Sequence, residues 1–361
     1  MSKLDKKSKF LELEGVRVTY RPKDDTIHIT SKDKDLQSEG FHLTLKNGTP
    51  SEDSLRRLLT EKGLIKPTAS NKLSSFIKYP FDAAPSWSKI PLGVNSNDEV
   101  VFWDVLKDPH ALAAGRAGGG KSIIQRVIFA HCVAHNDEWE VMGLDSRGGL
   151  KYLENYPKTT SSVNSTLQEV ADSLTRALAV IADRYQEIER IGGLTYKDII
   201  VNLETLEPVR SIMIFVDELE LIHPDSHGAY RTESFLEEND FRMSIFKSIA
   251  QIARIGRAAG VHLMVANQEV NASRINRELK NNLTYRVAMG NMSPQQSNSI
   301  LNSEAAINIG GNTGRGYASS VMGEAGDEFQ AYFPSYDAID ELILRNPMLD
   351  PARYAHLVRG H

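Results

Sequence analysis

A glycine-rich motif restricts what this chain can fold into more than any other feature. Residues 115–122 read Gly-Arg-Ala-Gly-Gly-Gly-Lys-Ser and match the pattern G-x-x-x-x-G-K-[ST] in full. The apolar run His-Ala-Leu-Ala-Ala precedes it and Ile-Ile-Gln-Arg-Val-Ile-Phe-Ala follows it, which predicts a turn between a buried strand and a helix. Glycines permit the positive φ angles that point successive backbone N–H groups at phosphate oxygens. The residues expected to bind a nucleotide are Gly115, Arg116, Ala117, Gly118, Gly119, Gly120, Lys121 and Ser122.

The last two residues of the motif carry the chemistry of such a loop. A helix that begins here adds the positive end of its dipole to the phosphate site. The Lys121 amine is expected to reach the β- and γ-phosphates of ATP, and the Ser122 hydroxyl to ligate Mg²⁺. ATP and Mg²⁺ are therefore the cofactors that the motif predicts.

A second apolar run ends in two carboxylates. Ser211-Ile-Met-Ile-Phe-Val is followed directly by Asp217 and Glu218. A buried strand with this ending delivers both acids to the carboxyl edge of a parallel sheet, where ligands bind in such folds. We expect Asp217 to hold Mg²⁺ through water and Glu218 to orient and polarise the attacking water.

A third apolar run, Val261-His-Leu-Met-Val-Ala, ends in the amides Asn267 and Gln268. An amide at this place can hydrogen bond the γ-phosphate or the attacking water, so Gln268 is expected to report which nucleotide is bound. A polar strand end that only enters a loop is the alternative interpretation.

Apolar strands alternate with long amphipathic helices from about residue 88 onward, which predicts an α/β fold with a mostly parallel central sheet. Long helices are expected over about 165–190 and 241–258. The candidate strands are 98–103, 110–114, 139–144, 211–216, 261–266, 284–289 and 328–333.

The first part of the chain has a different pattern. A hairpin is expected over 15–31, and a helix from Ser51 to about Gly63, which together predict a small α+β module. The expected division is 1–65 for this module, 66–87 for a proline-containing linker, 88–340 for the nucleotide-binding domain and 341–361 for a C-terminal tail.

Composition constrains the partners only weakly. The net charge of −5 excludes a uniformly basic surface, although residues 1–80 hold 16 Lys and Arg against 11 Asp and Glu. A basic first module could touch phosphates, but a solvated small domain explains the same charges. The single cysteine, Cys132, excludes an internal disulfide and fits a cytoplasmic protein. No run of about 18 apolar residues is present, so no membrane span is expected.

Two further segments resemble the motor domain of the FtsK/SpoIIIE family, within the wider HerA–FtsK group. Residues 252–268 read IARIGRAAGVHLMVANQ, and residues 275–301 read INRELKNNLTYRVAMGNMSPQQSNSIL. Family members show a helix ending in arginines, Ala-Ala-Gly-hydrophobic-His, a strand ending in Thr-Gln or Ser-Gln, and then roughly Asn-Leu-x-x-Arg-hydrophobic. Asp183-Arg184-Tyr185 and Gly314-Arg315-Gly316-Tyr317 also fall where the family has counterparts, so the resemblance extends over about 88–335.

This resemblance implies a RecA-like motor that acts as a homo-oligomeric ring, commonly a hexamer, and pulls a polymer through a central pore. ATP would lie between subunits, and an arginine of the neighbour would complete the site by stabilising charge on the γ-phosphate. Arg286 is the first candidate for this arginine, with Arg254 and Arg257 as alternatives; an ordinary ion pair at Arg286 stays open. Double-stranded DNA is the substrate implied first, as in a plasmid-transfer, phage or mobile-element pump, and tethering to a membrane or capsid partner stays open.

The chain also departs from the family pattern. Asn267 stands where Thr or Ser is usual, and Glu269 where a basic residue is more usual. Residues 222–240, expected to form a loop, contain five acids and a single arginine, which disfavours contact with DNA. Two other functions therefore stay open: an ATPase like those of type VII secretion that moves a protein, and a slow ATP-dependent switch or assembly factor.

Overall fold

The chain divides into two units, Met1–Lys72 and Leu73–His361, and each contains its own β-sheet. The computed structural model describes residues 10–13, 16–21, 26–31, 41–44, 77–81, 86–145, 148–160, 166–199, 209–219, 233–268, 275, 277–310, 313–321 and 326–344. The finer domain boundaries expected at residues 65, 87 and 340 stay predictions.

The first unit contains an antiparallel sheet in the order β1-β2-β3-β4. Its strands are β1 (Phe10–Leu13), β2 (Val16–Arg21), β3 (Thr26–Ser31) and β4 (Phe41–Thr44). The predicted hairpin is confirmed, because β2 and β3 pair antiparallel from Val16↔Ser31 to Arg21↔Thr26. The helix predicted from Ser51 to Gly63 lies outside the described residues.

The second unit is built on one large sheet, in the order β7-β6-β14-β13-β12-β8-β11-β10-β9, with β5 beside β14. The strands from β12 to β9 pair in parallel, and those from β13 to β7 pair antiparallel. The α/β fold with a parallel centre is thus confirmed, and the structure adds an antiparallel flank. The strands are β5 (Ile77–Lys78), β6 (Lys89–Asn95), β7 (Val100–Asp104), β8 (His110–Gly115), β9 (Trp139–Leu144), β10 (Ser211–Val216), β11 (Val261–Asn267), β12 (Tyr285–Met289), β13 (Arg315–Ser320) and β14 (Asp327–Phe333).

Two strands of the flank were not expected from the sequence. β6 contains Pro91, which sits at a register shift between Pro91 and Gly93 where a strand tolerates proline. β13 reads Arg-Gly-Tyr-Ala-Ser-Ser and so has little of the apolar alternation that marks a strand. Tertiary pairing with β12 and β14, rather than local pattern, makes it a strand.

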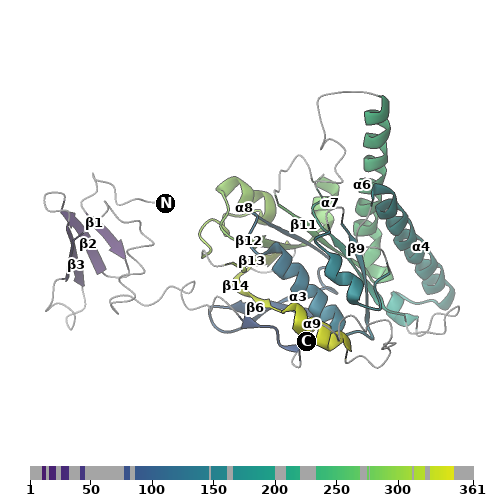
Figure 1. The fold of residues 1–361 in the computed structure, drawn as a ribbon, viewed down its shortest axis with the longest axis horizontal. Helices are drawn as coiled ribbons and strands as arrows, with labels where there is room; N and C mark the ends of the chain where they lie inside the picture. The colour runs from purple at the N-terminus through teal and green to yellow at the C-terminus, as the bar shows by residue number, and fades with distance from the viewer. Residues whose placement is uncertain are drawn as a thin grey trace. The chain divides into compact units, whose positions relative to one another are not determined.

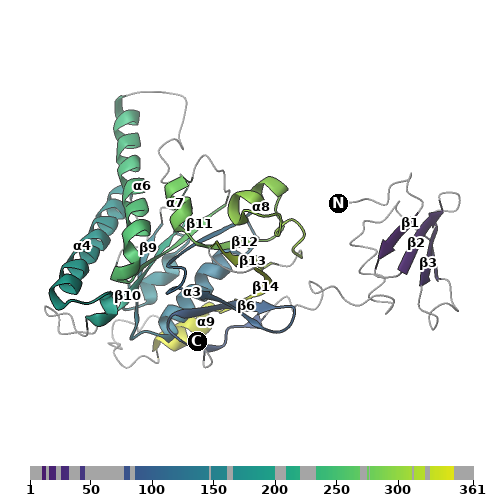
Figure 2. The ribbon, with the colours of Figure 1, turned by 180° about the vertical axis from the view of Figure 1, so that it is seen from behind.

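Helices cover both faces of this sheet (Figures 1 and 2). α3 and α9 lie over one face with the η3 turn, while α4 and α6 lie over the other. The helices and 3₁₀ turns are α3 (Lys121–Ala134), η3 (Lys151–Asn155), α4 (Leu167–Ile191), η4 (Tyr196–Asp198), α6 (Glu233–Ala259), α7 (Arg277–Asn282), α8 (Pro294–Leu301) and α9 (Tyr336–Leu344). None of the helices in these described ranges is both long and apolar enough to cross a lipid bilayer.

The two long helices differ from the prediction mainly at one end. α4 begins with a capping box between Thr166 and Glu169 and ends at Gly192, close to the predicted bounds. α6 begins at Glu233, well before the expected residue 241, so part of the predicted acidic loop is helix. Its first turns extend beyond the body of the domain (Figure 1).

The central strands explain why the sequence shows continuous apolar runs. Every residue of β8, β10 and β11 is buried, because helices cover both faces of the parallel part of the sheet. Phe129 of α3 and Phe215 of β10 pack in one core, and Ile249 of α6 and Leu263 of β11 pack in the other. This double burial fixes the positions at which the strands end, and therefore the site.

Candidate functional site

The glycine-rich motif forms the turn between β8 and α3 at the centre of the sheet, as predicted. Gly118 and Gly120 have φ angles of 78° and 114°, which side chains other than glycine rarely adopt. A Cβ on Gly120 would also lie 2.8 Å from the Cα of Gly314, which follows from the close approach of the β13 end to the turn. The turn therefore has the backbone shape of a phosphate-binding loop.

Lys121 is folded back over this turn. Its Nζ donates a hydrogen bond to the Gly115 carbonyl oxygen at 2.8 Å, and the residue is only 9% exposed. Burial lowers the pKa of the amine, and the carboxylates of Asp217 and Glu218 oppose this change. The cation and the two predicted acids are thus close enough to act on each other.

Asp217 and Glu218 follow β10 directly, at the carboxyl end of that strand. The Asp217 N–H donates to the Leu144 carbonyl oxygen at 3.1 Å, and Gln125 Nε2 donates to Asp217 Oδ1 at 3.1 Å. Burial raises the pKa of Asp217, while the hydrogen bond from Gln125 lowers it. Gln125 was not predicted as a site residue. It lies one helical turn after Lys121, so both side chains are on one face of α3.

Gln268 contacts the second acid. Its Nε2 donates a hydrogen bond to Glu218 Oε1, so two residues predicted from different motifs meet. Glu218 has a φ of 50°, a conformation that costs a non-glycine residue free energy and that recurs at functional sites. Asn267 is the buried last residue of β11, and Glu269 lies outside the described residues.

These side chains surround one open cavity of about 270 Å³. Two of its lining residues, Ile123 and Thr313, were not predicted from the sequence, because neither belongs to a polar motif. Gln330 of β14 donates to the Thr313 carbonyl oxygen at 3.0 Å, so the antiparallel flank supports this wall. The cavity is lined by Arg116, Ala117, Gly118, Gly120, Lys121, Ser122, Ile123, Asp217, Glu218, Gln268 and Thr313.

The lining fits a nucleotide with a magnesium ion. The glycine turn leaves room that Cβ atoms would fill, and a buried amine borders it. The Ser122 hydroxyl and the Asp217 carboxylate supply oxygen, the ligand atom that Mg²⁺ prefers.

Arg286, the first candidate for a neighbour's arginine, does not line the cavity of its own chain. The side chain is 2% exposed, and its guanidinium donates to the carbonyl oxygens of Leu283, Lys280 and Ile300, the last at 3.1 Å. Burial lowers the pKa of Arg286 to about 10. An arginine enclosed in this way holds parts of its own subunit together, which disfavours a role at the phosphates of another.

The two alternative arginines lie on the surface of α6. Arg254 is 61% exposed, with Nη1 3.8 Å from Glu278 Oε1, and Arg257 donates to the Leu106 carbonyl oxygen at 2.9 Å. A single exposed ion pair of this length holds a side chain weakly. Both arginines therefore stay candidates for a contact between subunits.

A model of the FtsK/SpoIIIE family matches residues 74–272, more than half of the chain. The chain belongs to the FtsK/SpoIIIE family. The resemblance seen in the sequence motifs is thereby confirmed, and the glycine-rich turn and the two acids that line the cavity lie within the matched residues.

Relatives of known name include proteins from two kinds of system. The chain is 26% identical over 265 residues to the ESX-4 secretion system protein EccC4 of Mycobacterium tuberculosis, which covers 68% of this chain and 20% of the relative. It is 26% identical over 228 residues to the DNA translocase FtsK of Halalkalibacterium halodurans, which covers 60% of this chain and 27% of the relative. The chain thus spans less than a third of the length of either relative.

Solved structures confirm the fold. The conjugation coupling protein TcpA of pCW3, in its monomer form with ATPγS, matches with a TM-score of 0.67 at 20% identity, and the match covers 93% of this chain and 91% of that one. The cytoplasmic domain of the type VII secretion ATPase EccC of Thermomonospora curvata matches with a TM-score of 0.56 at 21% identity, covering 81% and 36%. Membership of this family supports ATP binding, but it does not identify the substrate.

Proposed function

We propose that this chain hydrolyses ATP with Mg²⁺ and uses the energy to translocate double-stranded DNA as a homo-oligomeric ring. One observation carries the proposal of hydrolysis: residues from three separate motifs line a single cavity, namely Lys121 and Ser122, Asp217 and Glu218, and Gln268. A phosphate-binding loop facing two strand-end acids is the arrangement that phosphoryl transfer to water requires.

The proposed roles follow from where the side chains lie. Lys121 exchanges its bond to the Gly115 carbonyl for the phosphate oxygens of ATP. Glu218 accepts a proton from the water that attacks the γ-phosphorus, as the bond to the bridging oxygen of ADP breaks. Ser122 and Asp217 would hold Mg²⁺, which would supply positive charge against the phosphate oxygens. Gln268 holds Glu218 and is placed to sense the γ-phosphate.

Double-stranded DNA is preferred as the substrate because one relative is named a DNA translocase, and because the likeness in fold to a conjugation coupling protein extends over almost all of both chains. The acidic segment that argued against DNA is in part helical rather than a loop. Its described part lies in the first turns of α6, where Arg242 Nη2 is 2.6 Å from Glu238 Oε1. A helical ion pair partly offsets the local negative charge.

Steady-state hydrolysis in the presence of linear duplex tests this substrate. Adding duplex is expected to raise the ATPase rate, and the stimulation should fall steeply between 50 and 200 mM salt, by a factor of about 10³ in affinity if six phosphates are contacted. Lys121→Ala is the control, since it should bind duplex but show no stimulated hydrolysis. An ATPase rate unaffected by any duplex at low salt would overturn the DNA assignment.

A protein-moving ATPase is the second candidate, favoured by the likeness to EccC4 and by the net charge of −5. In that case duplex leaves hydrolysis unchanged at all salt concentrations, and a protein substrate stimulates it. Hydrolysis limited to one turnover, with no stimulation by either polymer, would instead indicate a slow switch.

A further inference from the structure

A second carboxylate lies beside Asp217, at the end of the neighbouring strand. β9 and β10 pair in parallel with Leu144 opposite Val216, so Asp145 and Asp217 are the next residues on adjacent strands. Asp145 is 1% exposed, and its Oδ2 accepts a hydrogen bond from the Leu150 N–H at 2.8 Å. The side chain therefore closes the short loop that leaves β9.

That loop packs directly on Asp217. A Cβ on Gly149 would lie 2.8 Å from Asp217 Oδ2 and 3.7 Å from Asp145 Oδ2. On the other side of the carboxylate, Gln125 Nε2 donates to Oδ1 at 3.1 Å. Asp217 is thus enclosed between the loop and α3, and a Cβ at position 149 would displace its carboxylate.

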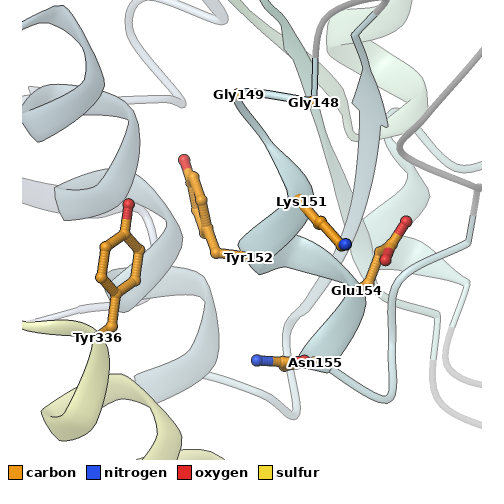
Figure 3. Close-up of a pocket in the computed structure, with 7 residues that line it drawn as sticks. All are labelled: Gly148, Gly149, Lys151, Tyr152, Glu154, Asn155 and Tyr336. Carbon is orange, nitrogen blue, oxygen red and sulfur yellow. The ribbon is translucent and has the colours of Figure 1, made fainter.

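The loop is not held in place by packing alone. Figure 3 shows Gly148 and Gly149 leading into η3, with the rings of Tyr152 and Tyr336 beside them. These residues border a cavity of about 390 Å³, and the two ring centroids are 5.7 Å apart. The loop is held on its core side by the buried Leu150 side chain, and the hydrogen bond from the Leu150 N–H to Asp145 ties its backbone beside Asp217.

We propose that Asp145 is a positioning residue for Asp217: it ties down the 148–150 loop, and the loop fixes the carboxylate in the orientation that receives Mg²⁺. The inference rests on the proposed function, because it assumes that Asp217 acts on the metal. It assigns Asp145 no contact with nucleotide or metal. Residues that orient a metal-binding group in this way commonly alter metal affinity or activity by about 10- to 100-fold.

Three variants separate positioning from other roles. Asp145→Ala removes the acceptor for the Leu150 N–H, whereas Asp145→Asn keeps an oxygen that can accept it. Gly149→Ala leaves Asp145 intact but places a methyl group against Asp217 Oδ2. Asp108→Asn is the matched control, since Asp108 is also buried and accepts from Ser320 Oγ at 2.9 Å, just before β8 begins at the other end of the strands.

The readouts are the Mg²⁺ concentration for half-maximal hydrolysis, kcat, binding of a fluorescent ATP analogue in EDTA, and hydrogen exchange of the 148–153 segment. Asp145→Ala is expected to raise the Mg²⁺ requirement and to lower kcat, each by about 10-fold or more. It should also speed exchange of the segment, and leave metal-free nucleotide binding within about twofold. Gly149→Ala should reproduce the metal effect, and Asp145→Asn and Asp108→Asn should stay within about threefold of the wild type.

A wild-type Mg²⁺ requirement in folded Asp145→Ala would overturn the inference. A change in Mg²⁺ requirement and kcat as large in Asp145→Asn as in Asp145→Ala would also overturn it, because the charge of Asp145 rather than its hydrogen bond would then matter. Thermal unfolding of each variant identifies loss of fold. If Asp145→Ala does not fold, Gly149→Ala decides alone, and a normal Mg²⁺ requirement there overturns the inference. A wild-type chain without Mg²⁺-dependent hydrolysis would contradict the proposed function itself, which is a separate outcome.

Discussion

The two ends of the parallel strands use polar residues in different ways. At the carboxyl ends, Lys121, Asp217 and Gln268 line an open cavity. At the amino ends, polar side chains are buried against backbone: His110 Nδ1 accepts from the Leu263 N–H at 3.0 Å, and His262 Nδ1 lies 3.0 Å from the Pro109 carbonyl oxygen. One end of the sheet thus supports chemistry and the other holds the strands together, so substitutions at the two ends should have different consequences.

The largest effect is expected at the carboxyl end, from Lys121→Ala. Loss of the amine removes the cation that meets the phosphates, so steady-state ATP hydrolysis should fall at least about 100-fold. The melting temperature should change little, because the amine makes a single hydrogen bond to the turn. A variant that hydrolyses ATP at more than a tenth of the wild-type rate would show that this end of the sheet is not the catalytic one.

At the amino half of β12, Arg286→Ala should affect stability instead. The substitution leaves three carbonyl oxygens without their buried donor, which should lower the free energy of unfolding by about 2 to 4 kcal/mol. Urea unfolding measures this loss. A variant as stable as the wild type but unable to hydrolyse ATP would restore Arg286 as the arginine offered to a neighbouring subunit.

Two buried histidines at the amino ends, His110 and His262, should make the free energy of unfolding depend on pH. A histidine in the unfolded chain takes up a proton near pH 6.5, whereas burial lowers the pKa of His110 to about 3 and of His262 to about 4. Between pH 6.5 and about 4 the unfolded state therefore binds more protons than the folded state. Each histidine should then lower the free energy of unfolding by about 1.4 kcal/mol for every pH unit of acidification. Above pH 6.5 both states are neutral and these groups contribute no slope. Urea midpoints that stay constant from pH 7 to 5 would contradict this account.

The smallest effect is expected for Gln125→Ala. Removing the amide frees Asp217 Oδ1, and the lost hydrogen bond to a charged group should lower kcat by about 5- to 10-fold. Gln168→Ala is the matched control, because Gln168 Nε2 donates to Asp172 Oδ1 at 2.9 Å on the exposed face of α4. Equal activity of the two variants would remove Gln125 from the site.

The cavity at the carboxyl ends of the strands could be predicted from sequence because its parts are local. The glycine turn before Lys121 and the acids after β10 each sit at the end of an apolar run, and burial on both faces produces that run. The same reasoning explains why Gln268 was found. In each case one short segment contains both the strand and the functional side chain.

What the sequence did not reveal depends on segments far apart in the chain. Arg286 was expected to be accessible, but carbonyl oxygens from α7, α8 and the loop before β12 converge on it. β13 is a strand because it pairs with β12 and β14, which come from other parts of the chain. Asp145 and Asp217 follow paired residues of adjacent strands, although η3, α4, η4 and β10 lie between them in the chain. No local pattern in the sequence predicts contacts between such distant segments.

Hydrolysis and binding by Glu218→Gln test the central claim most directly. The account predicts that the wild-type chain hydrolyses ATP only with Mg²⁺, and that Glu218→Gln binds ATP with unchanged affinity while its turnover falls by about 100- to 10,000-fold. Wild-type turnover in Glu218→Gln would contradict the account, as would a wild-type chain that neither binds nor hydrolyses ATP.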